Sequence, residues 1–266
     1  MRFKLIYEGD LLPIDYRNYF MKLIKDALNL SEEGKEYLDR LYHYEEDNIE
    51  KTNKAPKPFC FAIRFQHDKE EFKKEKNIFY LKSPVEFYIS SLDINFLVIL
   101  YNGLINKKLY PYKVGDGIIS KIINITLLKE KIIKDNKAIF KTLSPILIED
   151  KNKNPLLPID SDGDILENTS EKFVYFLREF NYLIDSILKG IRGEGIKERI
   201  ELRPIKIRKE VIKHRIREKN EEPCLYTFTC FSGVFELSGN PEDLDYLQKI
   251  GIGLRRAQGF GMVEVV

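Results

Sequence analysis

Strand patterns and amphipathic helix patterns alternate along this chain of 266 residues, once in each half. Near the start, Arg2 to Tyr7 alternate polar and apolar residues, and Tyr16 to Leu30 carry apolar residues at helical spacing. The pattern returns with a helix over Glu171 to Ile187 and strand-like segments over Arg199 to Lys219 and Leu225 to Leu237. Two such units predict an α+β protein of two lobes, each an antiparallel sheet with helices on one face.

Further helices and strands are expected in both lobes. Ser31 to Pro58 are expected to be irregular or weakly helical, and a helix over Asp93 to Leu104 is expected to be capped by Asp93. Asn240 is expected to cap a short helix over Pro241 to Ile250. The remaining expected strands are Phe59 to Phe65 paired with Asn77 to Leu81, Val85 to Ser90, Ile119 to Leu128 with Lys137 to Leu143 as its companion, and the closing Met262 to Val266.

The domain boundary is expected in a segment rich in Pro, Asp, Asn and Gly. This segment, residues 144–170, is predicted to link a first lobe of residues 1–143 to a second lobe of residues 171–266. Three cysteines without a CxxC pair, Cys60, Cys224 and Cys230, exclude a disulfide framework and are typical of ordinary thiols in a reducing compartment. No apolar run approaches the roughly 20 residues of a membrane span, so a cytoplasmic protein without membrane association is expected.

The overall charge balance hides an uneven distribution. The 44 Lys and Arg against 42 Asp and Glu give a net charge of +2, which by itself identifies no nucleic-acid partner. Residues 189–219, however, hold 12 Lys or Arg against 5 Glu, a net charge of +7, and the rest of the chain is left at −5. A run of charge is usually a solvated face, but one so biased in sign on a strand favours contact with a polyanion.

The C-terminal segment is unusually rich in glycine. Gly251, Gly253, Gly259 and Gly261 lie between a helix and the last strand, together with Arg255 and Arg256. A dinucleotide-binding loop would follow a strand and open a helix, which is the reverse order, and no GK[ST] phosphate loop is present. The residues alone leave two interpretations, a tight turn entering a strand or a loop whose arginines hold phosphates.

The segment FELSGNPEDLDYLQKIGIGLRRAQGFGMVEV closely resembles the C-terminal signature of the CRISPR-associated endoribonucleases that cut precursor guide RNA inside each repeat, a branch of the RAMP superfamily. The opening MRFKLIYE, the middle EFYISSLDINFLVILYNGL and the segment TLSPILI resemble the same family. The resemblance implies two tandem ferredoxin-like (RRM-like, βαββαβ) lobes with a C-terminal glycine-rich loop. It also implies metal-independent cleavage, without any cofactor, in which the ribose 2′-hydroxyl attacks the scissile phosphate and leaves a 2′,3′-cyclic phosphate and a 5′-hydroxyl.

The resemblance implies a catalytic histidine in the connection after the first helix, where this chain has His43, and a lysine before the next strand, where it has Lys57. Histidine suits proton transfer near neutral pH, and lysine suits stabilisation of the phosphorane or protonation of the leaving oxygen. Lys51 and Lys54 are alternatives to Lys57. Lys25 stands where some relatives have a tyrosine, and the alternatives for that role are Tyr37, Tyr42 and Tyr44. His67 is expected to have no role.

The RNA-binding residues are expected in the basic segment and the glycine-rich loop. They are Arg192, Lys197, Arg199, Arg203, Lys206, Arg208, Lys209, His214, Arg255 and Arg256. The expected partner is CRISPR repeat RNA, as precursor and as guide; other effector subunits and a second copy of the chain are compatible with the sequence. The alternative function is a non-catalytic RAMP-type subunit that binds guide RNA in an effector complex, and a third is an interaction protein whose basic strand binds any polyanion.

Overall fold

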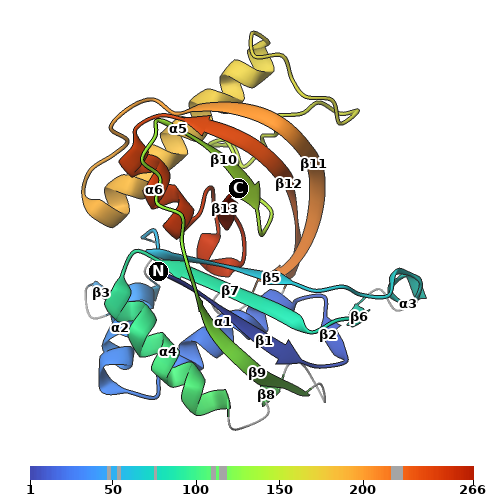
Figure 1. The fold of residues 1–266 in the computed structure, drawn as a ribbon, viewed down its shortest axis with the longest axis vertical. Helices are drawn as coiled ribbons and strands as arrows, with labels where there is room; N and C mark the ends of the chain where they lie inside the picture. Colours follow the sequence, from blue (N-terminus) through green and yellow to red (C-terminus); the bar gives the residue numbers. More distant parts are fainter. Residues whose placement is uncertain (47–48, 53–54, 75–76, 109–111, 114–118, 217–223) are drawn as a thin grey trace. The chain divides into compact units, whose positions relative to one another are not determined.

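The computed structural model describes residues 1–46, 49–52, 55–74, 77–108, 112–113, 119–216 and 224–266 (Figure 1). The chain divides into two compact units. The first contains residues 1–57 and 63–129, and the second contains residues 58–62 and 130–266. Each unit is described by itself.

The main strands of the first unit belong to a sheet with the order β5-β7-β1-β9-β8, in which residues 59–62 of the edge strand β5 are counted with the second unit. The strands of this sheet are β1 (Arg2–Glu8), β5 (Phe59–Arg64), β7 (Val85–Ser91), β8 (Tyr112–Lys113) and β9 (Ile119–Leu128). β1 pairs antiparallel with both β7 and β9. The helices α1 (Tyr16–Leu28) and α4 (Ile94–Lys108) connect β1 to β5 and β7 to β9. This order of strands and helices is βαββαβ, the ferredoxin-like arrangement.

The apolar face of α1 packs on this sheet. Alternation in β1 buries Phe3, Leu5 and Tyr7 on one face. Phe20 of α1 meets the ring of Tyr7 edge-on at 5.3 Å and lies 4.9 Å from the ring of Phe87 on β7. The core of the first unit therefore lies between the helical face and β1.

Short elements complete the first unit. They are β2 (Leu11–Pro13), α2 (Glu32–Tyr42), β3 (His43–Glu46), β4 (Ile49–Thr52), α3 (Lys69–Lys74) and β6 (Ile78–Tyr80). α2 was not expected as a regular helix. Ser31 caps it by accepting a hydrogen bond from the Gly34 N–H, and Glu32 and Glu33 occupy its first turn, where negative charge is favourable.

The second unit repeats the arrangement. Its sheet has the order β11-β12-β10-β13, with β10 (Lys137–Thr142), β11 (Glu201–Ile216), β12 (Cys224–Ser238) and β13 (Val263–Val265). The connecting helices are α5 (Glu171–Arg192) and α6 (Pro241–Ile250), and the short helix η1 (Arg256–Gln258) precedes β13. Ser170 and Asn240 cap α5 and α6, the latter as expected. The two ferredoxin-like lobes are thus both present.

The structure corrects three expectations about pairing and boundaries. β10 pairs with β12 and β13, so it opens the second sheet rather than accompanying β9. The boundary therefore falls at residues 129/130 rather than at 143, and residues 144–170 lie inside the second unit with Leu147 and Ile148 buried. The strands over 59–65 and 77–81 do not pair with each other, because β5 joins the main sheet and β6 pairs with β2.

Within the described residues, no helix is both long enough and apolar enough to cross a membrane. The three cysteines are free thiols; Cys60 and Cys230 are buried, and Cys224 is exposed.

Candidate functional site

His43 lies where α2 ends and the β3–β4 hairpin begins. Its backbone N–H donates to the Asp39 carbonyl at the end of α2, and it pairs with Thr52 in the hairpin. The imidazole is exposed. A helix end and a strand pair therefore fix its backbone, while its side chain remains accessible.

Two lysines approach the ring of the residue directly before His43. The Lys25 Nζ lies 4.2 Å from the centroid of the Tyr42 ring, and the Lys57 Nζ lies 5.5 Å from the same centroid. Lys25 comes from the last turn of α1, Tyr42 from the end of α2, and Lys57 from the segment before β5. Attraction between an ammonium and an aromatic face holds such pairs together. Residues Lys25, Tyr42, His43 and Lys57 are called the Tyr42 cluster below.

The surroundings shift the proton affinities in the Tyr42 cluster. Desolvation lowers the pKa of Lys25. Desolvation, and after it the positive charge of Lys25, lowers the pKa of Lys57. Burial raises the pKa of the Tyr42 hydroxyl. A lysine with a lowered pKa gives up its proton more readily, which suits a general acid, and two neighbouring ammonium groups suit an anion such as a phosphate.

The other candidates for these roles are placed differently. Lys54 lies outside the described residues, and the side chains of Lys51 and Tyr44 lie outside them as well. Tyr37 donates its hydroxyl hydrogen to Asp93 Oδ1 at 3.0 Å and carries the Arg40 guanidinium over its ring at 4.3 Å. Among the three tyrosines considered from the sequence, the structure brings Tyr42 next to the lysines.

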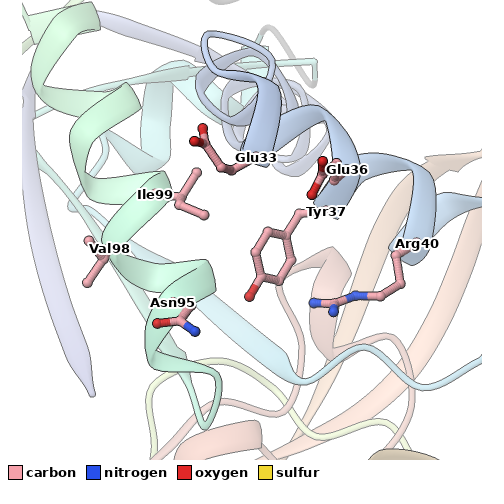
Figure 2. Close-up of a pocket in the computed structure, with 7 residues that line it drawn as sticks. All are labelled: Glu33, Glu36, Tyr37, Arg40, Asn95, Val98 and Ile99. Atoms are coloured by element: carbon pink, nitrogen blue, oxygen red, sulfur yellow. The ribbon is translucent and has the colours of Figure 1, made fainter.

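Tyr37 lines a groove between α2 and α4 of about 420 Å³ (Figure 2). Glu33 and Glu36 line it on the α2 side, and Val98 and Ile99 line it on the α4 side. The two carboxylates outnumber the one guanidinium of the lining, that of Arg40, so the charge of this groove disfavours phosphates.

His67 packs into an aromatic cluster. Its ring lies 4.9 Å from Phe79, 5.7 Å from Phe72 and 6.0 Å from Phe65. Desolvation, followed by the charge of Lys69, lowers the pKa of His67. These contacts give His67 a packing role.

Acidic partners neutralise many cations of the basic segment. Arg199, Arg203 and Arg208 are exposed and form ion pairs with acids on the same or the neighbouring strand. The acids are Glu201, Glu236 and Glu210. Exposed pairs of this kind contribute little stability, so a phosphate can replace the carboxylate at small cost.

Arg192 and Lys197 are engaged more deeply. The Arg192 Nη2 lies 2.6 Å from Asp243 Oδ1, with side chains 9% and 0% exposed, and the Lys197 backbone N–H donates to Asp243 Oδ2 at 2.7 Å. The Lys197 ammonium pairs with Glu242. These contacts tie the end of α5 to the first turn of α6, so Arg192 has a structural role and its expected RNA contact is corrected.

The expected RNA contact of His214 is corrected as well. Its side chain is 2% exposed and lies 5.9 Å from the ring of Phe260 and 6.4 Å from that of Phe228. Its strand position faces the core, because alternation turns every second residue of β11 inward there. An imidazole so deeply buried is not available to a phosphate.

Three lysines of β11 remain without an ion pair among the described residues: Lys206, Lys209 and Lys213. All three are exposed. From Lys206 onward β11 pairs with β12 without a further shift, so its side chains alternate between the two faces. Lys206 therefore lies on one face of the hairpin, and Lys209 and Lys213 lie on the other.

The glycines of the C-terminal segment adopt backbone conformations that other residues avoid. Gly251, Gly253, Gly259 and Gly261 have φ of 81°, 87°, 86° and 68°. A Cβ at Gly261 would collide with the Ile252 carbonyl oxygen. These glycines are needed for the close backbone path between α6 and β13.

The two arginines of this segment differ. Arg256 is 5% exposed and donates to the Ile250 carbonyl oxygen at 2.8 Å, and burial lowers its pKa to about 10. The expected RNA contact of Arg256 is therefore corrected. Arg255 is partly exposed, lies over the Phe228 ring at 4.5 Å and donates to Gln258 Oε1. Arg255 remains a candidate for phosphate contact.

Residues 128–265, just over half of the chain, match the family described as CRISPR associated protein Cas6, C-terminal. No curated protein matches the sequence. Among solved structures, a Cas6-related protein from Pyrococcus furiosus is 19% identical with a TM-score of 0.72, over 100% of this chain and 98% of that chain. A RAMP protein described as binding different RNA substrates is 19% identical with a TM-score of 0.71, over 100% and 99%. A Cas6 product complex is 16% identical with a TM-score of 0.57, over 100% and 98%. These structures share the fold of two ferredoxin-like lobes.

Proposed function

Because this chain belongs to the Cas6 family of CRISPR-associated proteins, we propose that it is an endoribonuclease that cuts CRISPR repeat RNA within precursor transcripts. The observation that supports catalysis is the Tyr42 cluster, in which an exposed histidine directly follows a tyrosine approached by two ammonium groups. A subunit that only binds guide RNA can use the two lysines for phosphates but does not require an exposed histidine beside them. The RNA-binding RAMP protein and the Cas6 product complex support RNA as the ligand through their likeness in fold.

In the proposed reaction, His43 accepts the proton of the ribose 2′-hydroxyl as its oxygen attacks the adjacent phosphorus. The new bond joins the 2′-oxygen to phosphorus, and the bond from phosphorus to the 5′-oxygen breaks. Lys57 donates a proton to the departing 5′-oxygen, and Lys25 stabilises the negative charge of the phosphorane. The products are a 2′,3′-cyclic phosphate and a 5′-hydroxyl, and the reaction is proposed to need no metal ion.

The test uses the repeat RNA of the same genome under single-turnover conditions. His43→Ala is expected to slow cleavage by about 100-fold or more, because it removes the general base. The dissociation constant for the RNA is expected to change by less than about twofold, since an exposed histidine contributes little binding. His67→Ala is the matched control and is expected to cleave as the wild type does.

The ends of the products test the mechanism. A cyclic phosphate, a 5′-hydroxyl and undiminished cleavage in EDTA support it. Cleavage by His43→Ala at the wild-type rate would contradict the role of His43. Tight binding of the repeat without any cleavage would favour the alternative of a guide-RNA-binding subunit, and equal competition by arbitrary RNA would favour a general polyanion-binding protein.

A further inference from the structure

A hollow of about 370 Å³ lies in the second unit, between the loop before α5, the first turns of α5 and one face of the β11–β12 hairpin. Apart from Lys209, no residue of its lining has been given a role above. Its volume falls in the range of about 300–1,000 Å³ that is typical of ligand sites.

The lining combines apolar surface with positive charge. Leu156, Leu157 and Tyr175 give it partly exposed apolar and aromatic surface, and Lys172 and Lys209 supply ammonium groups. Neither lysine forms an ion pair among the described residues. This combination suits a flat, weakly polar ring that is attached to an anion.

The nearby carboxylates are occupied by their own loops. Asp160 Oδ1, the one acid of the lining, accepts three backbone N–H groups at 2.9 Å, from residues 162, 163 and 164. Asp150 accepts the backbone N–H groups of Asn152 and Asn154 and the hydroxyl hydrogen of Tyr175. The lining thus contains two ammonium groups and one carboxylate, and the carboxylate is engaged in a turn. The net charge of the lining is therefore positive, which favours an anion.

The positive charge continues along the hairpin on the same side as the hollow. Lys209, Val211 and Lys213 alternate onto one face of β11, and Val211 is 57% exposed. Thr229, which lines the hollow, pairs with Val211, and Thr227 pairs with Lys213 beyond the lining. A chain of phosphates can therefore run from the hollow along an exposed strand face.

We propose that this hollow receives an unstacked base of single-stranded RNA while the neighbouring phosphates contact Lys209 and Lys213. Single-stranded RNA is bound by combining base contacts on apolar or aromatic side chains with cations along the backbone. The inference rests on the proposed function, since the RNA is taken to be the repeat, and it adds a binding site separate from the Tyr42 cluster.

The first test measures binding of a repeat RNA with a 2′-deoxy nucleotide at the mapped cleavage site, so that binding is separated from cleavage. Abasic nucleotides are placed one at a time along its single-stranded part. In the wild type, one position is expected to lose about tenfold in affinity when its base is removed. Thr229→Trp fills the hollow, so it is expected to weaken binding of the intact RNA and to abolish the dependence on that base.

Thr227→Trp is the matched control, because it adds the same ring on the same strand face outside the lining. It is expected to keep the dependence on the single base. Lys209→Gln is expected to weaken binding several-fold more than Lys206→Gln, which removes the same charge from the opposite face of β11. Equal effects of the two tryptophans, or of the two glutamines, would overturn the site in favour of a uniformly charged surface.

A second measurement needs neither the repeat nor cleavage. A short oligouridylate containing 4-thiouridine is crosslinked to the intact protein, and the attached peptides are mapped. Crosslinks to Tyr175 or Leu156 that Thr229→Trp removes support the site, and crosslinks confined to other segments overturn it. A wild-type protein that cleaves the repeat but shows neither signal refutes the hollow and leaves the proposed function standing. A wild-type protein that shows both signals but does not cleave the repeat refutes the proposed function and leaves the hollow standing as an RNA-binding site.

Discussion

At the scale of single residues, Tyr42 organises the candidate active site through its ring. Lys25 stands where the family resemblance places a tyrosine in some relatives, and the structure sets its ammonium 4.2 Å from the Tyr42 ring centroid. An ammonium group therefore stands here in place of a hydroxyl group. The charge acts on Lys57, whose pKa it lowers in addition to desolvation.

Lys25→Gln is expected to shift the pH dependence of cleavage. In the proposed reaction the rate falls on the alkaline side as Lys57, the proposed general acid, loses its proton, at a pH set by its pKa. Removing the charge of Lys25 removes one of the two causes that lower this pKa, so the pKa of Lys57 rises and the alkaline limb moves to higher pH. Single-turnover rates measured across the alkaline range test this shift.

Lys25→Arg keeps the positive charge and is the control for that experiment. It is expected to leave the alkaline limb close to its wild-type position. A limb that moves equally in both variants, or in neither, would contradict the electrostatic coupling of the two lysines.

Arg192 illustrates a cation whose role is structural. Breaking a buried ion pair by removing one partner costs about 3 kcal/mol, because the other charge is left buried alone. Arg192→Met is expected to lower the free energy of unfolding by about this amount, since Asp243 is fully buried. Urea unfolding provides the measurement. Arg199→Met, which removes an exposed cation of the same segment, is expected to change the free energy of unfolding by less than about 0.5 kcal/mol.

At the scale of elements, the connection from α6 to β13 depends on a backbone path that excludes side chains. Gly261 has a φ of 68°, and a Cβ there would meet the carbonyl oxygen of Ile252. Gly163 has a φ of 94° but open space around it. Substitutions at the two positions therefore distinguish the loss of stability caused by backbone conformation alone from the further loss caused by a collision.

Gly163→Ala is expected to destabilise the protein by about 1 kcal/mol through backbone conformation alone. Gly261→Ala is expected to cost more than about 2 kcal/mol, because the backbone of Ile252 must also shift. Unfolding in urea, monitored by circular dichroism, compares the two. Equal losses would contradict the collision as the added cost.

The elements that could be predicted from the sequence are those with strong local signals. β1 and β9 follow apolar alternation or apolar runs, and α6 begins at its Asn240 cap as expected. α2 was missed because the segment from Ser31 to Pro58 was interpreted as a whole from its charged residues and its prolines, although Tyr37, Leu38, Leu41 and Tyr42 recur at helical spacing within it. The partners of β10 lie about 90 to 130 residues further along the chain, and no local pattern reports such pairing.

The candidate site was also predictable only in part, because some of its contacts join residues that are distant in the sequence. His43 and Lys57 follow from the family resemblance, whereas the contacts of Lys25 with Tyr42 depend on how α1 and α2 pack. The error at Arg192 arose because its partner Asp243 lies 51 residues away. The error at His214 arose because a core-facing strand position was assumed to face solvent.

At the scale of the whole molecule, the distribution of charge is more even than the sequence of the basic segment suggests. The segment carries a net charge of +7, but acids from outside it supply partners to Lys189, Arg192, Lys197 and Arg203. The cations without ion pairs in the described part of this segment lie on β11. Binding of a polyanion is therefore expected to use a small group of cations on the hairpin rather than the segment as a whole.

The salt dependence of RNA binding tests this view. Each phosphate neutralised by a cation contributes about −0.7 to the slope of log K against log salt for a single strand. Two to three contacts, from Lys209, Lys213 and Arg255, predict a slope of about −1 to −2. Dissociation constants measured for the uncleavable repeat RNA over a range of salt concentrations give this slope. Twelve contacts would give about −8, and a slope of that size would show that the ion pairs of the segment open to bind RNA. Lys209→Gln is expected to make the slope less steep by about 0.7, the share of one contact. The Lys209 ammonium pairs with no carboxylate among the described residues, so it can neutralise a phosphate without first breaking an ion pair.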